Sequence, residues 1–150
     1  MRTSSSLRII AEVKNLSEIR RFVQEKASAL VLDSLRQGLV LDPAVIPNVI
    51  LAVDEAVSNI IVHGYQGQGG AIEIEVSREG DALVIRIRDE AAPFDPTIVP
   101  PPDVTLPLAQ RIPGGLGIHL IRQIMDEMTH RVTSQGGNEL TLVKRGIEGG

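Results

Sequence analysis

Cysteine is absent from this chain of 150 residues, and so is tryptophan. Without cysteine the fold can hold no disulfide, no thiolate metal site and no thiol nucleophile, and a reducing cytoplasm is the natural compartment. The aromatic residues are Phe22, Tyr65 and Phe94 alone. A planar ligand would therefore have to lie between aliphatic side chains rather than stack on aromatic rings.

Basic residues are also too few for a cationic surface. The chain has 15 Lys and Arg against 19 Asp and Glu, which gives a net charge of −4. This balance argues against broad binding of nucleic-acid phosphates or anionic lipids. No apolar run approaches the roughly 20 residues of a membrane span, and the N-terminus has no secretion signal. We therefore expect a cytoplasmic protein that binds neither nucleic acid nor membrane directly.

Hydrophobic residues make up 43% of the chain, which is enough to bury the core of one domain over residues 1–150. Alternating apolar residues predict strands at 7–13, 71–77, 82–88, 131–134 and 139–144. Helical spacing predicts one helix from Asn15 to a break at Gly38, and others at 47–63 and 116–128. This order predicts a layered sheet with helices on one face.

Proline is concentrated in one window, because seven of the nine prolines lie between Pro93 and Pro113. A loop of about 20 residues is long for a compact domain and is typical of a functional lid or a disordered connection. Prolines cannot join a sheet, so we expect residues 97–110 to be mobile without a ligand.

Two polar residues interrupt the apolar helix predicted at 47–63. Glu55 and Asn59 lie one turn apart, and apolar residues occupy nearly every other side, so both are expected to point into a recess. A carboxylate and an amide oxygen in this arrangement suit a proton acceptor and a ligand for Mg²⁺. Taken alone, however, the spacing is more typical of a solvated helix surface.

Two further motifs suit the ends of a nucleotide. Asp89 ends an apolar strand and precedes Ala91 and Ala92, so its carboxylate could accept from the amine of a base beside small residues. Alone, it reads as a turn-initiating aspartate. Residues 113–117, P-G-G-L-G, precede a helix whose free N–H groups could bind phosphate, although a flexible hinge explains them equally well.

In their order, these motifs resemble a known superfamily. Residues 54–65, D-E-A-V-S-N-I-I-V-H-G-Y, resemble the N box of the ATPases that include gyrase B, Hsp90, histidine kinases and MutL. Residues 89–96, D-E-A-A-P-F-D-P, resemble the first glycine box, and residues 114–121, G-G-L-G-I-H-L-I, resemble the second. The sequences of the three motifs are most similar to those of the bacterial anti-sigma factor serine/threonine kinases.

The resemblance implies an α+β fold of Bergerat type. This fold is a two-layer α/β sandwich with a mixed, mostly antiparallel sheet, helices on one face and an ATP lid at about residues 90–113. The implied cofactors are ATP and Mg²⁺. Glu55 would be the general base for a substrate serine or threonine, and Asn59 the Mg²⁺ ligand. The other nucleotide-binding positions would be Asp89 for the adenine amine, Ala91 beside it, Thr141 as a water-mediated relay, and Gly114, Gly115, Leu116 and Gly117 at the phosphates.

One position departs from the pattern: Ala91 stands where the family usually has glycine. The implied function is an ATP-dependent protein kinase that acts as an anti-sigma factor and phosphorylates a STAS-type antagonist. A sigma factor and a second copy of the chain are the other implied partners. Two alternatives stay open, namely a non-catalytic ATP-binding partner-switching module of the same fold and a nucleotide-free protein-binding domain.

Overall fold

A computed structural model describes residues 3–36, 38, 42–100, 105 and 115–147. It contains five strands and three α-helices, together with three short helical turns. The elements are β1 Thr3–Ile10, η1 Val13–Asn15, α1 Leu16–Arg36, α2 Val45–Asn59, η2 Ile60–Gly64, β2 Ala71–Glu79, β3 Ala82–Asp89, η3 Pro96–Ile98, α3 Gly115–Ile124, β4 Glu127–Val132 and β5 Asn138–Arg145.

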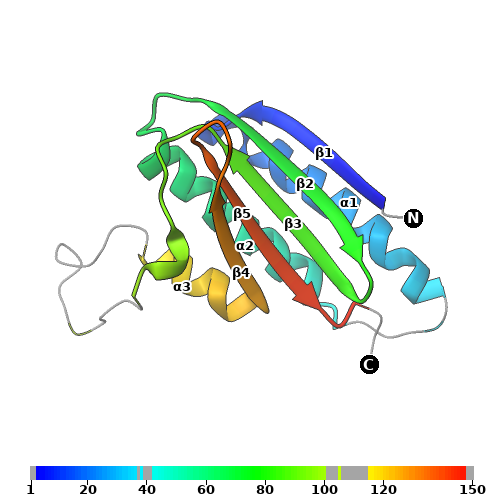
Figure 1. Ribbon diagram of the computed structural model, residues 1–150. Coiled ribbons are helices and arrows are strands. Elements are labelled where there is room, and N and C mark those ends of the chain that lie inside the picture. The colour runs from blue at the N-terminus through cyan, green and yellow to red at the C-terminus, as the bar shows by residue number, and fades with distance from the viewer. Residues whose placement is uncertain (1–2, 37, 39–41, 101–104, 106–114, 148–150) are drawn as a thin grey trace.

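The strands form one sheet in the order β1-β2-β3-β5-β4, and α1 and α2 lie against one face of it (Figure 1). The predicted α+β fold with helices on one side is confirmed. Every strand pairing among the described residues is antiparallel, so the expected mixed character of the sheet is not found. Hairpins join β2 to β3 and β4 to β5, while α1 and α2 connect β1 to its neighbour β2, and α3 precedes the edge strand β4.

The core lies between the sheet and the helices, where apolar side chains of the strands face α1 and α2. On β2, Ile72, Ile74 and Val76 face the helices, while the intervening glutamates face the other way. Helix α2 is central and buries Val49 and Val53 against this layer. Each fully buried aliphatic side chain contributes about 1.5–3 kcal/mol, so these contacts fix the position of α2 on the sheet.

The stretch Val45–Gly64, which comprises α2 and η2, has a mean hydropathy of 1.7 and is long and apolar enough to cross a membrane by length and composition. This corrects the expectation that no apolar run reaches such a length. Val49, Ala52 and Val53 of this stretch belong to the core cluster, and core helices meet the same criterion.

Helix α3 is shorter than its helical spacing predicts. It ends at Ile124, and β4 already begins at Glu127, where a helix was predicted to continue to residue 128. Met128 pairs with Leu142 in the β4–β5 ladder. Glu127 and Met128 therefore belong to the sheet although their local pattern is also compatible with a helix, because strand pairing outweighs a weak local preference.

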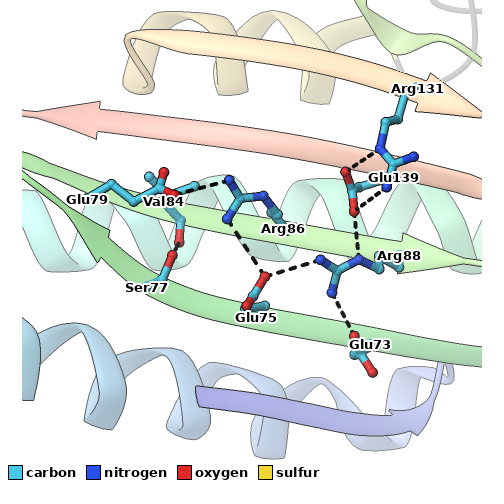
Figure 2. Close-up of polar contacts among 9 residues, drawn as sticks. All are labelled: Glu73, Glu75, Ser77, Glu79, Val84, Arg86, Arg88, Arg131 and Glu139. Atoms are coloured by element: carbon cyan, nitrogen blue, oxygen red, sulfur yellow. Dashed lines mark hydrogen bonds and ion pairs between the residues drawn. The ribbon is translucent and has the colours of Figure 1, made fainter. Parts of the chain in front are cut away.

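The sheet face away from the helices carries a network of alternating charges (Figure 2). Arg88 on β3 contacts Glu73 on β2 at 2.7 Å and Glu139 on β5 at 2.7 Å, and Arg131 on β4 contacts the same Glu139 at 2.7 Å. The hydrogen bond from Arg131, together with Arg88, lowers the pKa of Glu139 despite its burial. A connected network of this kind stabilises a sheet more than isolated exposed ion pairs do.

Candidate functional site

A cavity of about 300 Å³ lies between α2, η2, α3 and the ends of β3, β4 and β5. Its walls are mostly apolar, with a few polar groups among them, and its volume is at the lower end for small-molecule pockets. The lining residues are Ala56, Asn59, Ile60, His63, Gly64, Gln66, Asp89, Ala91, Ala92, Pro93, Phe94, Pro96, Ile118, Ile121, His130, Asn138 and Leu140.

Asp89 supplies the carboxylate of this cavity. It is the last residue of β3, lies on the helix side of the sheet and is only 9% exposed. Its Oδ1 accepts hydrogen bonds from the N–H of Ala91 and from Nδ2 of Asn138, both at 2.9 Å. Among the described residues no group donates to Oδ2. Burial raises the pKa of Asp89 even though the hydrogen bonds from Asn138 and Ala91 oppose that shift. The carboxylate has lost part of its water, so it would gain from a hydrogen-bond donor on a ligand.

The buried amide of Asn138 holds the loop that follows Asp89. Its Nδ2 donates to Asp89 and to the carbonyl oxygen of Ala92 at 3.1 Å, and its Oδ1 accepts from the N–H of Phe94 at 2.9 Å. This pattern leaves one orientation of the amide. The role of Asn138 could not be predicted from the sequence, because the stretch Gly136–Asn138 predicts a hairpin turn and a turn needs no buried partner.

His130 extends this network toward the proline-rich segment. Its Nε2 lies 2.7 Å from Oδ1 of Asn138, which can only accept, so Nε2 carries the proton. Its Nδ1 lies 3.8 Å from Oδ1 of Asp95. Asp95 in turn accepts from the N–H of Thr97 at 2.8 Å and caps η3.

Arg122 of α3 fixes the described start of the predicted lid. Its guanidinium donates to the carbonyl oxygens of Val99 at 2.6 Å, Pro96 at 3.2 Å and Thr97. The first residues of the segment predicted to be mobile are therefore anchored to the helix that follows it. Residues 101–104 and 106–113 of the predicted lid, and the predicted phosphate-binding residue Gly114 after it, lie outside the described residues.

Glu55 and Asn59 lie one turn apart on α2, as predicted, and both side chains are half-exposed. Neither makes a hydrogen bond or ion pair with any residue in the described part of the chain. A β-carbon at Gly117, in the first turn of α3, would lie 2.7 Å from Oε2 of Glu55. Only glycine permits this approach, which brings the start of α3 against the carboxylate of α2.

The remaining predicted positions divide into two groups. Gly115 begins α3, Leu116 is 51% exposed beside it, and Ala91 is a buried wall of the cavity. Among the described non-glycine residues only Gln66 has a positive φ, so the backbone at Ala91 accommodates a side chain without strain.

Thr141 is not brought to the cavity. Its neighbours Leu140 and Leu142 face the core, and Thr141 pairs with Arg86 and Thr129 on the opposite face of the sheet. A water-mediated relay between Thr141 and Asp89 would have to cross the sheet, so the predicted role of Thr141 is wrong. Asn138, three residues earlier and on the correct face, contacts Asp89 directly.

The comparison with protein families accounts for this arrangement. Residues 9–144 match the family described as the histidine kinase-like ATPase domain. The chain belongs to this family. Membership confirms the resemblance of the three motifs, and use of ATP follows from it at the level of the family.

Individual relatives are similar over parts of their length. The serine/threonine-protein kinase BtrW of Bordetella bronchiseptica is 32% identical over 93 residues, which cover 61% of this chain and 65% of that protein. The serine-protein kinase RsbW of Bacillus cereus is 32% identical over 97 residues, 62% of this chain and 59% of that protein. An anti-sigma F factor of Clostridium kluyveri is 29% identical over 108 residues, 69% of this chain and 75% of that protein. The match thus spans less than two thirds of the first two relatives.

Proposed function

We propose that this protein is an ATP-dependent serine/threonine protein kinase that acts as an anti-sigma factor. The observation that carries the proposal is the buried carboxylate of Asp89, with Oδ2 uncommitted, in the same apolar cavity as Asn59. The names of the relatives BtrW, RsbW and anti-sigma F factor support the kinase and anti-sigma parts.

The cavity suits an adenine base. Oδ2 of Asp89 can accept from an exocyclic amine, and small and aliphatic residues such as Ala91, Ala92 and Ile118 form flat walls. Guanine presents a carbonyl oxygen where adenine presents the amine, so the carboxylate would repel it. An unmade hydrogen bond at such a buried group costs about 1–3 kcal/mol, which is enough for selectivity.

The donor set also suits Mg²⁺. The described residues contain no cluster of three His, Asp or Glu that could hold a metal by itself. Mg²⁺ at nucleotide sites usually takes one or two protein oxygens and fills its shell with phosphate oxygens and water. The free amide oxygen of Asn59 could be one such protein ligand, and the bound ion would neutralise charge on the phosphates.

Glu55 would act as the base for a substrate hydroxyl. In the proposed reaction the substrate oxygen attacks the γ-phosphorus, the bond from this phosphorus to the β–γ bridging oxygen breaks, and ADP leaves. The proton of the hydroxyl passes to a carboxylate oxygen of Glu55. Phosphoryl transfer depends mainly on alignment and charge neutralisation, and Gly115, Leu116 and Gly117 at the N-terminus of α3 offer N–H groups for the phosphates.

The partners are proposed by analogy with the relatives. We propose a STAS-type antagonist as the phosphorylated protein, a sigma factor as the second ligand, a homodimer as the working assembly and the cytoplasm as the compartment.

The test is transfer of labelled γ-phosphate from ATP, with Mg²⁺, to STAS-domain proteins of the same organism. Glu55→Ala should bind ATP with nearly unchanged affinity and transfer no label. Undiminished transfer by this variant would refute the role of Glu55. ATP binding without transfer to any of these proteins would instead favour the non-catalytic module of the same fold, and absence of ATP binding would favour the nucleotide-free domain.

A further inference from the structure

The hydroxyl group of Tyr65 connects two segments at the edge of the cavity. It donates a hydrogen bond to the carbonyl oxygen of Ala71, 2.6 Å away at the first residue of β2. It accepts one from the N–H of Glu90, 2.7 Å away, directly after β3. Burial raises the pKa of Tyr65, so the phenol keeps the proton that it donates. A phenol has one O–H donor, and in Tyr65 both this donor and the oxygen acceptor make a hydrogen bond.

The position of the ring follows from the π-helical turn η2. The N–H of Tyr65 donates to the carbonyl oxygen of Ile60 at 2.8 Å, five residues earlier, which widens the end of the helix that carries Asn59. Turns of this kind are frequent at functional sites. The ring then lies over Gly70, where a β-carbon would overlap it. Backbone geometry on both sides therefore determines where the hydroxyl lies.

The bond to Glu90 matters because the chain leaves the sheet at this point. Asp89 is the last paired residue of β3, opposite Ile72 and Asn138. Beyond it, the side chain of Asn138 holds the loop from the β5 side through the carbonyl oxygen of Ala92. The hydroxyl of Tyr65 holds the same loop from the β2 side, at the peptide adjacent to Asp89.

We propose that Tyr65 is a positioning residue that aims the carboxylate of Asp89 at the base, acting through the N–H of Glu90. The inference rests on the proposed function, since it assumes a nucleotide base in the cavity. Tyr65 directly follows η2, and η2 continues α2, the helix that carries Glu55 and Asn59. One hydroxyl therefore links the segment that binds the base to the segment that serves the phosphates, and keeps both ends of one nucleotide in register.

The decisive variant is Tyr65→Phe, which keeps the ring and removes the oxygen. The peptide next to Asp89 loses its restraint on the β2 side, and the bonds from Ala91 and Asn138 then hold the carboxylate less precisely. The Kd for ATP should therefore rise about tenfold, and the preference for ATP over GTP should shrink by a similar factor. Gly70→Ala displaces the ring by a different route and should change both quantities in the same direction.

The control is Val23→Ala, a fully buried position on α1, which does not line the cavity. It should lower the melting temperature and leave the Kd and the ATP preference unchanged. The melting temperature of each variant is measured without nucleotide, and Gly70→Ala decides the question if Tyr65→Phe does not fold.

The outcomes separate the inference from the function on which it rests. If the wild type binds no ATP, both fail. If the wild type binds ATP selectively and Tyr65→Phe has the same Kd and the same preference, the inference is overturned while the proposed function stands. An equal loss for ATP and GTP would mean that Tyr65 only supports the fold, and this result also overturns the inference. A larger loss for ATP supports it.

Discussion

Replacing Asn138 by alanine tests the network beneath the cavity, because this one amide serves several buried partners. It donates to Asp89 at 2.9 Å and to the carbonyl oxygen of Ala92 at 3.1 Å, and it accepts from the N–H of Phe94 at 2.9 Å. Nε2 of His130 makes a further bond to it at 2.7 Å. Alanine would leave these groups without their partner in the protein.

The expected loss is large for a single side chain. A hydrogen bond to a charged group contributes about 1.5–3 kcal/mol, and each buried group left unpaired costs about 1–3 kcal/mol. Because the bonds share one side chain and the cavity admits some water, we expect a total near 3 kcal/mol rather than the full sum. For a domain of this size, that loss lowers the melting temperature by about 6–12 °C.

The assay is chemical or thermal denaturation of the wild type and Asn138→Ala, with Asn15→Ala as the matched control. Asn15→Ala removes the same amide group, but Asn15 makes one exposed bond, to the carbonyl oxygen of Ile10 at 2.9 Å. The loss in free energy of unfolding for this variant should therefore stay below about 1 kcal/mol. Asn138→Asp preserves the shape and sets a second carboxylate against Asp89, so its loss should be largest at neutral pH and smaller in acid. Equal losses of stability for Asn138→Ala and Asn15→Ala would show that the bonds of Asn138 beneath the cavity do not stabilise the fold more than one exposed bond does.

Three further outcomes follow from the same geometry. Gly117→Ala should displace the carboxylate of Glu55, lowering phosphoryl transfer by about a hundredfold while the melting temperature stays nearly constant; unchanged transfer would contradict the close approach. The arginine partners of Glu139 lower its pKa, so its ionised form adds stability above the ordinary glutamate pKa, and that stability is lost as pH falls through the lowered value. Glu139→Gln should thus be less stable than the wild type at neutral pH and equal to it in strong acid, and a constant difference across a pH series of denaturation curves would count against this. Arg122→Ala should speed amide hydrogen exchange at residues 97–99, where unchanged exchange rates would show that its bonds do not anchor this segment.

Periodicity was sufficient to predict most of the architecture. The alternation of apolar and charged residues on β2 and in the second half of β3, and the apolar stripe of α2, are local signals that the tertiary structure does not oppose. The end of α3 could not be predicted from helical spacing, because the next residues pair with β5, where Glu127 lies opposite Val143 and Met128 opposite Leu142. The π-helical turn η2 has no local signal of comparable strength.

The candidate site was partly predictable for a related reason. The motifs identify Glu55, Asn59 and Asp89 from the local sequence, and the structure brings the two elements that carry them, α2 and β3, together at one end of the sheet. Thr141 and Asn138 depend instead on strand register, where a shift by an odd number of residues moves a side chain to the other face. No pattern within the β4–β5 hairpin distinguishes these two residues before its pairing with β3 is known.

Asp89 is proposed to bind the amine of an adenine base, and the test is calorimetric titration of MgATP into the wild type and into Asp89→Asn. The amide keeps an oxygen for Ala91 and Asn138 but can turn a donor toward the exocyclic amine. The loss of a charged hydrogen bond then predicts an affinity for ATP that is about ten- to a hundredfold weaker, with a fold at least as stable because a buried charge is removed. Equal ATP affinity of the two proteins would contradict the account.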